Sequence, residues 1–171
     1  MPRTGLLRIS LSIFLIAAGI VSGSTGPALA QSSLANGRGN PAIQLRNAGR
    51  VRTISIAAIE ALPQSELTGR VSPDEPVATC QGALLSDVVD AIGATKTDRI
   101  TVRASDGYAA DIPRKDWKTW PILVATRCSG HRLTVRQRGP ARILYPATLY
   151  PELANRTYVD RSVWMIAEIE W

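Results

Sequence analysis

Two arginines in the last third of the chain are the residues best suited to hold an anion. Arg138 opens an Arg-Gly-Pro turn that leads into a short apolar strand over 143–145, and Arg161 opens the sequence Arg-Ser-Val-Trp. Each guanidinium presents a planar fork of donors that stays charged at ordinary pH, which suits an oxygen-rich anionic ligand. Gly139 lacks a Cβ and Pro140 fixes the turn, so the backbone there can approach a ligand closely. We expect both guanidiniums to lie on the surface; the alternative is a solvated turn beside a core strand.

The cysteines are the second group that could do chemistry. Cys80 and Cys128 are the only two in the chain, and His131 is the only histidine. In an oxidising compartment an even count favours a Cys80–Cys128 disulfide, and two buried, unpaired thiols are an equal alternative. A third alternative is that Cys80 ligates a metal ion as a thiolate. One histidine and two widely separated cysteines do not match a zinc site, and we interpret His131 as a surface side chain.

Several common functions lack their signatures. The chain has no Gly-x-Ser-x-Gly elbow, phosphate-binding loop, dinucleotide fingerprint or haem-attachment motif. Hydrolase, kinase and nicotinamide-dehydrogenase activities are therefore disfavoured. The basic residues are scattered and no run reaches five like charges, so we expect no nucleic-acid partner.

The first 30 residues have the pattern of an export signal. A basic start is followed by an apolar run over 11–21, and Ala28-Leu29-Ala30 supplies small residues before a cleavage site. The run is shorter than the roughly 20 residues of a spanning helix, so we expect cleavage rather than a retained membrane span. Removing Arg3 and Arg8 lowers the formal net charge from +6 to +4. We predict a periplasmic protein.

The remaining chain predicts one α+β domain with a mixed β-sheet and short helices. We expect a flexible lead-in over 31–50 and the domain over 51–171. Helical spacing predicts helices at 54–62, capped by Ser55, and at 84–92, with a short helical turn after Pro113. Alternating or continuous apolar runs bounded by turn residues predict strands at 67–71, 77–81, 99–104, 108–112, 122–126, 132–135, 143–145 and 163–171.

Five segments form a recognisable series: 82–89, 105–113, 121–125, 138–146 and 161–164. In this order they resemble the molybdopterin-binding domain of the sulfite oxidase family, especially its small, exported, single-domain members. The resemblance implies the fold of that domain and a molybdopterin cofactor held by backbone groups and basic side chains. Arg138, Gly139 and Arg161 lie on the segments that would hold it, and Asp106 and Tyr108 border the cleft that the resemblance implies.

The chain also departs from that family. In its catalytic members a cysteine thiolate upstream of the Gly-x-x-Leu helix ligates molybdenum, whereas residues 67–76 contain no cysteine, and Cys80 does not match the ligand position. Two functions follow from the resemblance and this departure. One is a periplasmic molybdopterin-binding oxidoreductase-like domain without the usual ligand, and the other is a non-catalytic module that binds a small anionic ligand or a periplasmic protein. A periplasmic redox partner is a third idea, for which Trp117, Trp120 and Tyr150 could supply an aromatic patch, and core packing explains the two tryptophans about as well.

Overall fold

The computed structural model describes residues 41–70 and 76–171. The predicted export signal over 1–30 and the predicted turn at 72–74 lie outside the described residues. In chain order the elements are β1 (Ala42–Asn47), β2 (Arg50–Ser55), α1 (Ile56–Glu60), β3 (Gln64–Arg70), β4 (Val77–Leu84), α2 (Leu85–Ala91), β5 (Arg99–Ala104), β6 (Ala109–Pro113), α3 (Arg114–Thr119), β7 (Leu123–Cys128), β8 (His131–Arg132), η1 (Val135–Gln137), β9 (Arg142–Leu144), η2 (Pro151–Leu153), α4 (Arg156–Arg161) and β10 (Ile166–Glu170).

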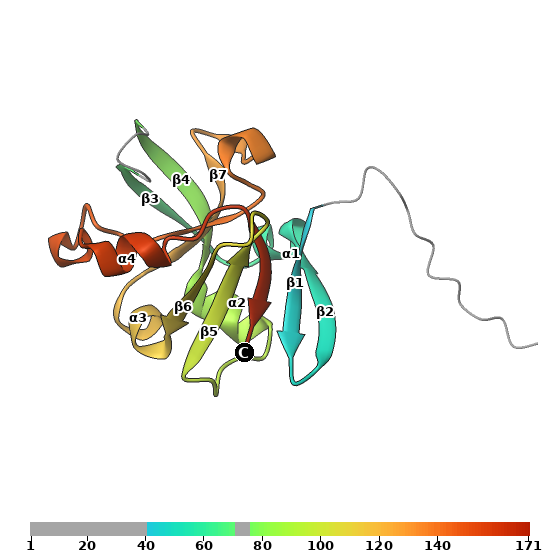
Figure 1. The fold of residues 1–171 in the computed structure, drawn as a ribbon. Helices are drawn as coiled ribbons and strands as arrows, with labels where there is room; N and C mark the ends of the chain where they lie inside the picture. The colour runs from blue at the N-terminus through green and yellow to red at the C-terminus, as the bar shows by residue number, and fades with distance from the viewer. Residues whose placement is uncertain (1–40, 71–75) are drawn as a thin grey trace, which may run out of the picture. The chain divides into compact units, whose positions relative to one another are not determined.

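The strands form two sheets, which we call sheet A and sheet B (Figure 1). Sheet A has the order β2-β1-β10-β5-β6, in which β1 and β10 are parallel and the other neighbours antiparallel. Sheet B has the order β3-β4-β7-β8, and β9 also pairs with β7. The α-helices are short, since α2 has 7 residues. The predicted α+β fold with a mixed sheet is therefore confirmed.

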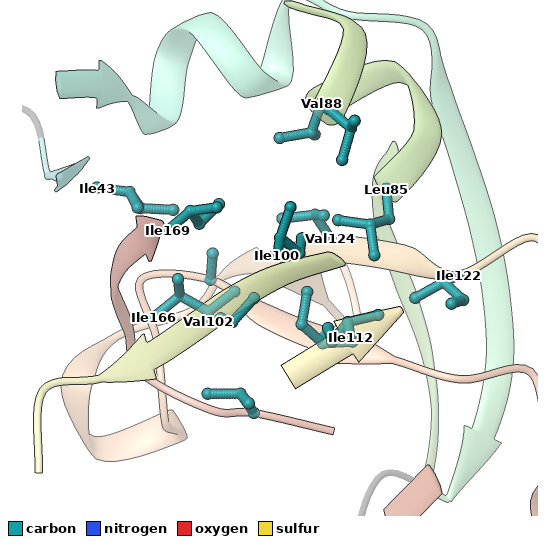
Figure 2. Close-up of a cluster of buried hydrophobic side chains, with 14 of the residues drawn as sticks. Ile43, Leu85, Val88, Ile100, Val102, Ile112, Ile122, Val124, Ile166 and Ile169 are labelled. Carbon is teal, nitrogen blue, oxygen red and sulfur yellow. The ribbon is translucent and has the colours of Figure 1, made fainter. Parts of the chain in front are cut away.

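The main core is formed by the apolar faces of the strands together with α1 and α2. Figure 2 shows isoleucine and valine side chains of β1, β5, β6 and β10 packed with those of α2 and β7. Strand alternation explains the set, because residues two apart point to the same face of a sheet. Leu85, predicted to be a core residue of the second helix, is fully buried.

Sheet B carries a second apolar cluster on its other face, which we call the outer face of sheet B. Cys80, Leu123, Ala125 and Leu144 are buried there, whereas their neighbours Val124 and Ile143 point into the main core. Sheet B is thus apolar on both faces. An apolar face is stable when other segments shield it from water, and residues 145–164 lie over this face of sheet B.

Local signals explain most of the boundaries. The Ser55 hydroxyl accepts a hydrogen bond from the Ala58 amide at 3.1 Å and so caps α1, as predicted. Gly82 follows a shift of register in β4, and a Cβ at this position would lie 2.0 Å from the Val124 carbonyl oxygen. Only glycine fits where two strands approach so closely.

The expected flexible lead-in over 31–50 is wrong from residue 42 onward. Residues 42–47 form β1, whose Ile43 and Leu45 are buried and whose backbone pairs with both β10 and β2. Polar residues on both sides obscure this short apolar alternation, and pairing with the last strand of the domain stabilises it. The domain therefore begins before residue 51.

The aromatic residues proposed for a partner surface are largely occupied in packing. Trp117 is buried in the main core, and Trp120 and Tyr150 pack against it while half-buried. The core-packing alternative therefore holds for the two tryptophans, and Tyr150 packs against the core as well. Within residues 41–70 and 76–171, no helix combines the length and apolar character needed to cross a membrane.

Candidate functional site

The two segments that carry the predicted arginines lie side by side. Backbone hydrogen bonds join the Met165 amide to the Arg138 carbonyl at 3.0 Å and the Ile143 amide to the Val163 carbonyl at 2.8 Å. The first segment leads into β9 of sheet B and the second into β10 of sheet A. Residues 138–166 therefore connect sheet B to sheet A through these backbone hydrogen bonds.

Arg138 and Gly139 are held by their own chain. Arg138 has a left-handed backbone with φ of 59°, and its guanidinium carbon lies 3.8 Å from the centre of the Trp164 ring. A Cβ on Gly139 would lie 2.3 Å from the Leu133 carbonyl oxygen, and the Gly139 amide donates to the Thr134 carbonyl at 2.8 Å. The close approach that we predicted at Gly139 is thus made to residues 133 and 134.

Arg161 is not the exposed guanidinium that the sequence led us to expect. It donates from Nη1 to Asp116 Oδ2 at 2.9 Å, and the Arg161 side chain is only 25% exposed. The Tyr145 hydroxyl donates to the same carboxylate oxygen at 2.8 Å, and Asp116 is 2% exposed. Burial raises the pKa of Tyr145 well above its usual value, and the hydrogen bond to the Asp116 carboxylate is the second cause of this rise. A buried carboxylate with these partners is a structural ion pair.

Sequence reasoning missed Asp116. Asp116 lies in α3 next to Trp117, and both are buried. A carboxylate next to a core tryptophan in a short helix was the one sequence feature that could have indicated a buried ion pair. Its partner Arg161 is 45 positions away in the chain. Nothing in the local pattern connects the two.

Asp106 and Tyr108 lie on the turn between β5 and β6. One Asp106 carboxylate oxygen accepts from the Tyr108 amide at 3.0 Å, and the Tyr108 hydroxyl donates to the Asp160 carbonyl on α4 at 2.6 Å. Burial and the nearby negative charge of Asp160 raise the pKa of Tyr108 above its ordinary value. The turn is thus fastened to α4.

A cavity of about 510 Å³ lies over the outer face of sheet B, and we call it the main cavity. Its floor is formed by β3, β4 and β9, and its walls by the segment after β9, by η2, by α4 (red in Figure 1) and by Trp164. The lining residues are mostly apolar or hydroxyl-bearing: Leu67, Gly69, Ala78, Leu144, Tyr145, Ala147, Thr148, Leu153, Ala154, Tyr158, Val159, Ser162 and Trp164. This volume is in the range of pockets that bind small molecules.

A second cavity of about 320 Å³, the side cavity, adjoins the first. The two share Val159, Ser162 and Trp164 as wall residues, and the side cavity adds Asp106 and Tyr108. Of the five residues predicted to hold a cofactor, these two line a cavity. Arg138, Gly139 and Arg161 line neither cavity, although the Arg138 guanidinium packs on Trp164, which lines both.

Several polar groups of the cavity walls are used within the protein, whereas the buried indole nitrogen of Trp164 has no hydrogen-bond partner among the described residues. Thr148 Oγ1 donates to the Thr68 carbonyl at 2.8 Å, and Ser162 Oγ donates to the Tyr158 carbonyl at 2.9 Å. Both Asp160 carboxylate oxygens accept from Arg156 Nε, at 2.8 and 2.9 Å. No lysine, arginine or histidine is among the residues that line the two cavities in the described part of the chain.

Cys80 and Cys128 form a disulfide between β4 and β7, on the outer face of sheet B. Of the two equal alternatives, the structure has the disulfide and not two unpaired thiols, and within this bond Cys80 offers no thiolate to a metal ion. Arg142, 4% exposed, donates from Nη2 to Cys128 Sγ at 3.2 Å. Among the described residues no group of three or more histidine, cysteine, aspartate or glutamate side chains could hold a metal ion.

Comparison with known proteins supports the fold. No family model matches the chain, and no curated protein matches it. Among solved structures it is similar to the sulfane dehydrogenase SoxCD from Paracoccus pantotrophus, with a TM-score of 0.57 and 10% sequence identity over 75% of this chain. The match covers 37% of the SoxCD chain, so this protein corresponds to about a third of its length. At this identity the likeness shows a shared fold and no more.

Proposed function

We propose that this chain is an exported, periplasmic module with the sulfite oxidase fold that binds a small ligand in the main cavity and performs no molybdenum chemistry. The observation that carries the proposal is the combination of this cavity with a disulfide that contains both cysteines of the chain. The disulfide also agrees with export to an oxidising compartment.

The donor set does not fit a thiolate-bound molybdenum. A soft metal ion favours thiolate ligands, and here both sulfurs are bonded to each other. The phosphate of a molybdopterin needs charged or backbone donors, whereas no basic side chain is among the described residues that line either cavity. The residues present therefore support no catalytic step through this cofactor.

The fold itself favours a second candidate, a molybdopterin-binding oxidoreductase. In this candidate Arg138 and Arg161 hold the anionic cofactor, and Asp106 and Tyr108 border it. It requires Arg161 to leave Asp116, and it requires a metal site that does not depend on a cysteine thiolate or that forms after the disulfide is reduced. These two requirements make it the less supported candidate.

Elemental analysis separates the two candidates. The processed protein is purified from its native periplasm, and its molybdenum content, free-thiol count and bound small molecules are measured, the last by native mass spectrometry. A molybdopterin enzyme purified from the same cells serves as the control for cofactor supply. We expect no stoichiometric molybdenum, no free thiol and an organic ligand that dissociates on denaturation. Molybdenum near one atom per chain would contradict the proposal.

A further inference from the structure

We propose that the ligand of the main cavity is a flat, uncharged compound of two or three rings that lies against Trp164 and Tyr158. This inference rests on the proposed function, because it names the class of ligand that the binding module takes. Three features of the cavity support it: the aromatic character of its walls, the internal pairing of nearby charges, and its volume.

Aromatic side chains are concentrated around the cavities. The whole chain has only nine, namely four tryptophans, four tyrosines and one phenylalanine. Tyr145, Tyr158 and Trp164 line the main cavity, and Tyr108 joins Trp164 around the side cavity. Four of the nine therefore face these two cavities. Flat aromatic walls favour a flat ligand, since offset-stacked and edge-to-face ring pairs add to the energy of burial.

Neighbouring side chains hold the two principal rings in place. The Arg138 guanidinium lies over the Trp164 ring at 3.8 Å. Tyr158 packs edge-on against Trp120, with ring centres 5.1 Å apart, and against Tyr145 at 5.3 Å. Walls fixed in this way lose little side-chain entropy when a ligand binds, so they suit a rigid partner.

The charged side chains of α4, which forms a wall of the main cavity, are paired within the protein. Arg161 forms an ion pair with Asp116. Arg156 forms an ion pair with Asp160, which lines the side cavity. Asp106 accepts a hydrogen bond from its own turn. A charged ligand in the main cavity would lose its hydration without gaining an oppositely charged partner from the lining residues, so an uncharged ligand binds best.

The volume sets the size of the ligand. An apolar cavity of about 150 Å³ takes up one benzene molecule, so the main cavity, at about 510 Å³, holds about three rings. The side cavity can take a substituent past Val159. A single ring would leave much of the apolar wall uncovered.

Three probes with one ring system and different charges test the inference: naphthol, naphthalenesulfonate and naphthylmethylammonium. Each is titrated by calorimetry at pH 7 into the processed, disulfide-bonded chain. We expect naphthol to bind at least about tenfold more tightly than either charged probe. Tighter binding of naphthalenesulfonate or of the ammonium compound would overturn the inference, and so would the absence of naphthol binding.

A pair of variants locates the binding. Ala154 is exposed and lines the main cavity, so Ala154→Phe fills the cavity from its wall. Ala57 is exposed on α1 and lines neither cavity, so Ala57→Phe is the matched control. Naphthol affinity should fall at least about tenfold in the first variant and stay unchanged in the second. If A154F fails to fold, Val159→Trp on α4 replaces it.

Equal binding by both variants would place the probe elsewhere and overturn the inference. The proposed function is judged separately by molybdenum content and by the ligand released from native protein. A released anionic ligand would contradict the inference and leave the binding module standing, whereas stoichiometric molybdenum would contradict the binding module itself.

Discussion

The outer faces of the two sheets are built in opposite ways. The outer face of sheet A carries ion pairs across neighbouring strands, such as Arg46–Glu168 at 3.0 Å and Arg103–Glu168 at 3.4 Å. The outer face of sheet B carries a disulfide and buried leucines instead. A charged face can meet water directly, whereas an apolar face must be covered. The difference explains why η2 and α4 lie over sheet B and why the cavity forms there.

The largest effect that we expect concerns the disulfide of sheet B. It joins residues 48 positions apart, and a cross-link of this span stabilises a protein by about 4 kcal/mol in the chain-entropy account. The double variant Cys80→Ala/Cys128→Ala should therefore lose about 4 kcal/mol of unfolding free energy, measured in urea.

A second cross-strand pair of sheet B, between β3 and β4, is the control for this prediction. Thr68 and Thr79 are exposed cross-strand partners whose hydroxyl oxygens lie 2.7 Å apart. The double variant Thr68→Ala/Thr79→Ala should lose about 1 kcal/mol or less. Equal losses in the two double variants would show that the disulfide does not determine the stability of this face.

Asp116 provides the next comparison, between a buried and an exposed ion pair. Removing one partner of a buried pair typically costs about 3 kcal/mol or more, so we expect Asp116→Ala to be destabilised by about 3 kcal/mol. Asp111 on sheet A pairs with Arg99 at 3.7 Å in an exposed position, and Asp111→Ala should cost about 0.5 kcal/mol. Thermal or chemical unfolding of both variants measures the difference. Similar costs would mean that Asp116 does not anchor Arg161 and Tyr145.

Local sequence patterns were enough to predict most of the fold. Gly93 and Pro63 mark the ends of the predicted helices, and the strand over 99–104 was predicted at its observed bounds. β1 was missed because Ile43 and Leu45 are its only buried apolar residues and Asn, Gly and Gln surround them. α4 was missed because its residues are largely polar and exposed.

The candidate site was less accessible to sequence reasoning, because it depends on contacts between distant segments. The main cavity forms only where α4, η2 and sheet B come together, and no single segment of the sequence has a pattern that predicts it. Arg161 has the sequence context of an anion-binding residue, but its guanidinium forms an ion pair with the buried Asp116 carboxylate in α3. Compartment and count left a Cys80–Cys128 disulfide and two unpaired thiols as equal alternatives, and only the structure places the two cysteines opposite each other on β4 and β7.

The smallest effect that we expect is at Glu168 on sheet A. Hydrogen bonding from Arg46 lowers the pKa of Glu168 below its ordinary value. The stabilisation from this carboxylate is therefore complete above about pH 4.3, the usual glutamate pKa, and is lost as the pH falls through the lower value in the folded state. At pH 7, Glu168→Gln should cost less than about 1 kcal/mol, and the difference from the natural chain should vanish in acid and shrink in high salt. Unfolding curves from pH 7 to 2 check this, and a difference independent of pH would contradict it.

The most direct test of the binding-module account is a crystal structure of the protein purified from its native source without added ligand. The account predicts a flat organic molecule between Trp164 and the leucines of sheet B, with the bond between Cys80 and Cys128 intact. A pterin with a molybdenum atom bound near an open disulfide would contradict the account and would identify the chain as a molybdopterin enzyme.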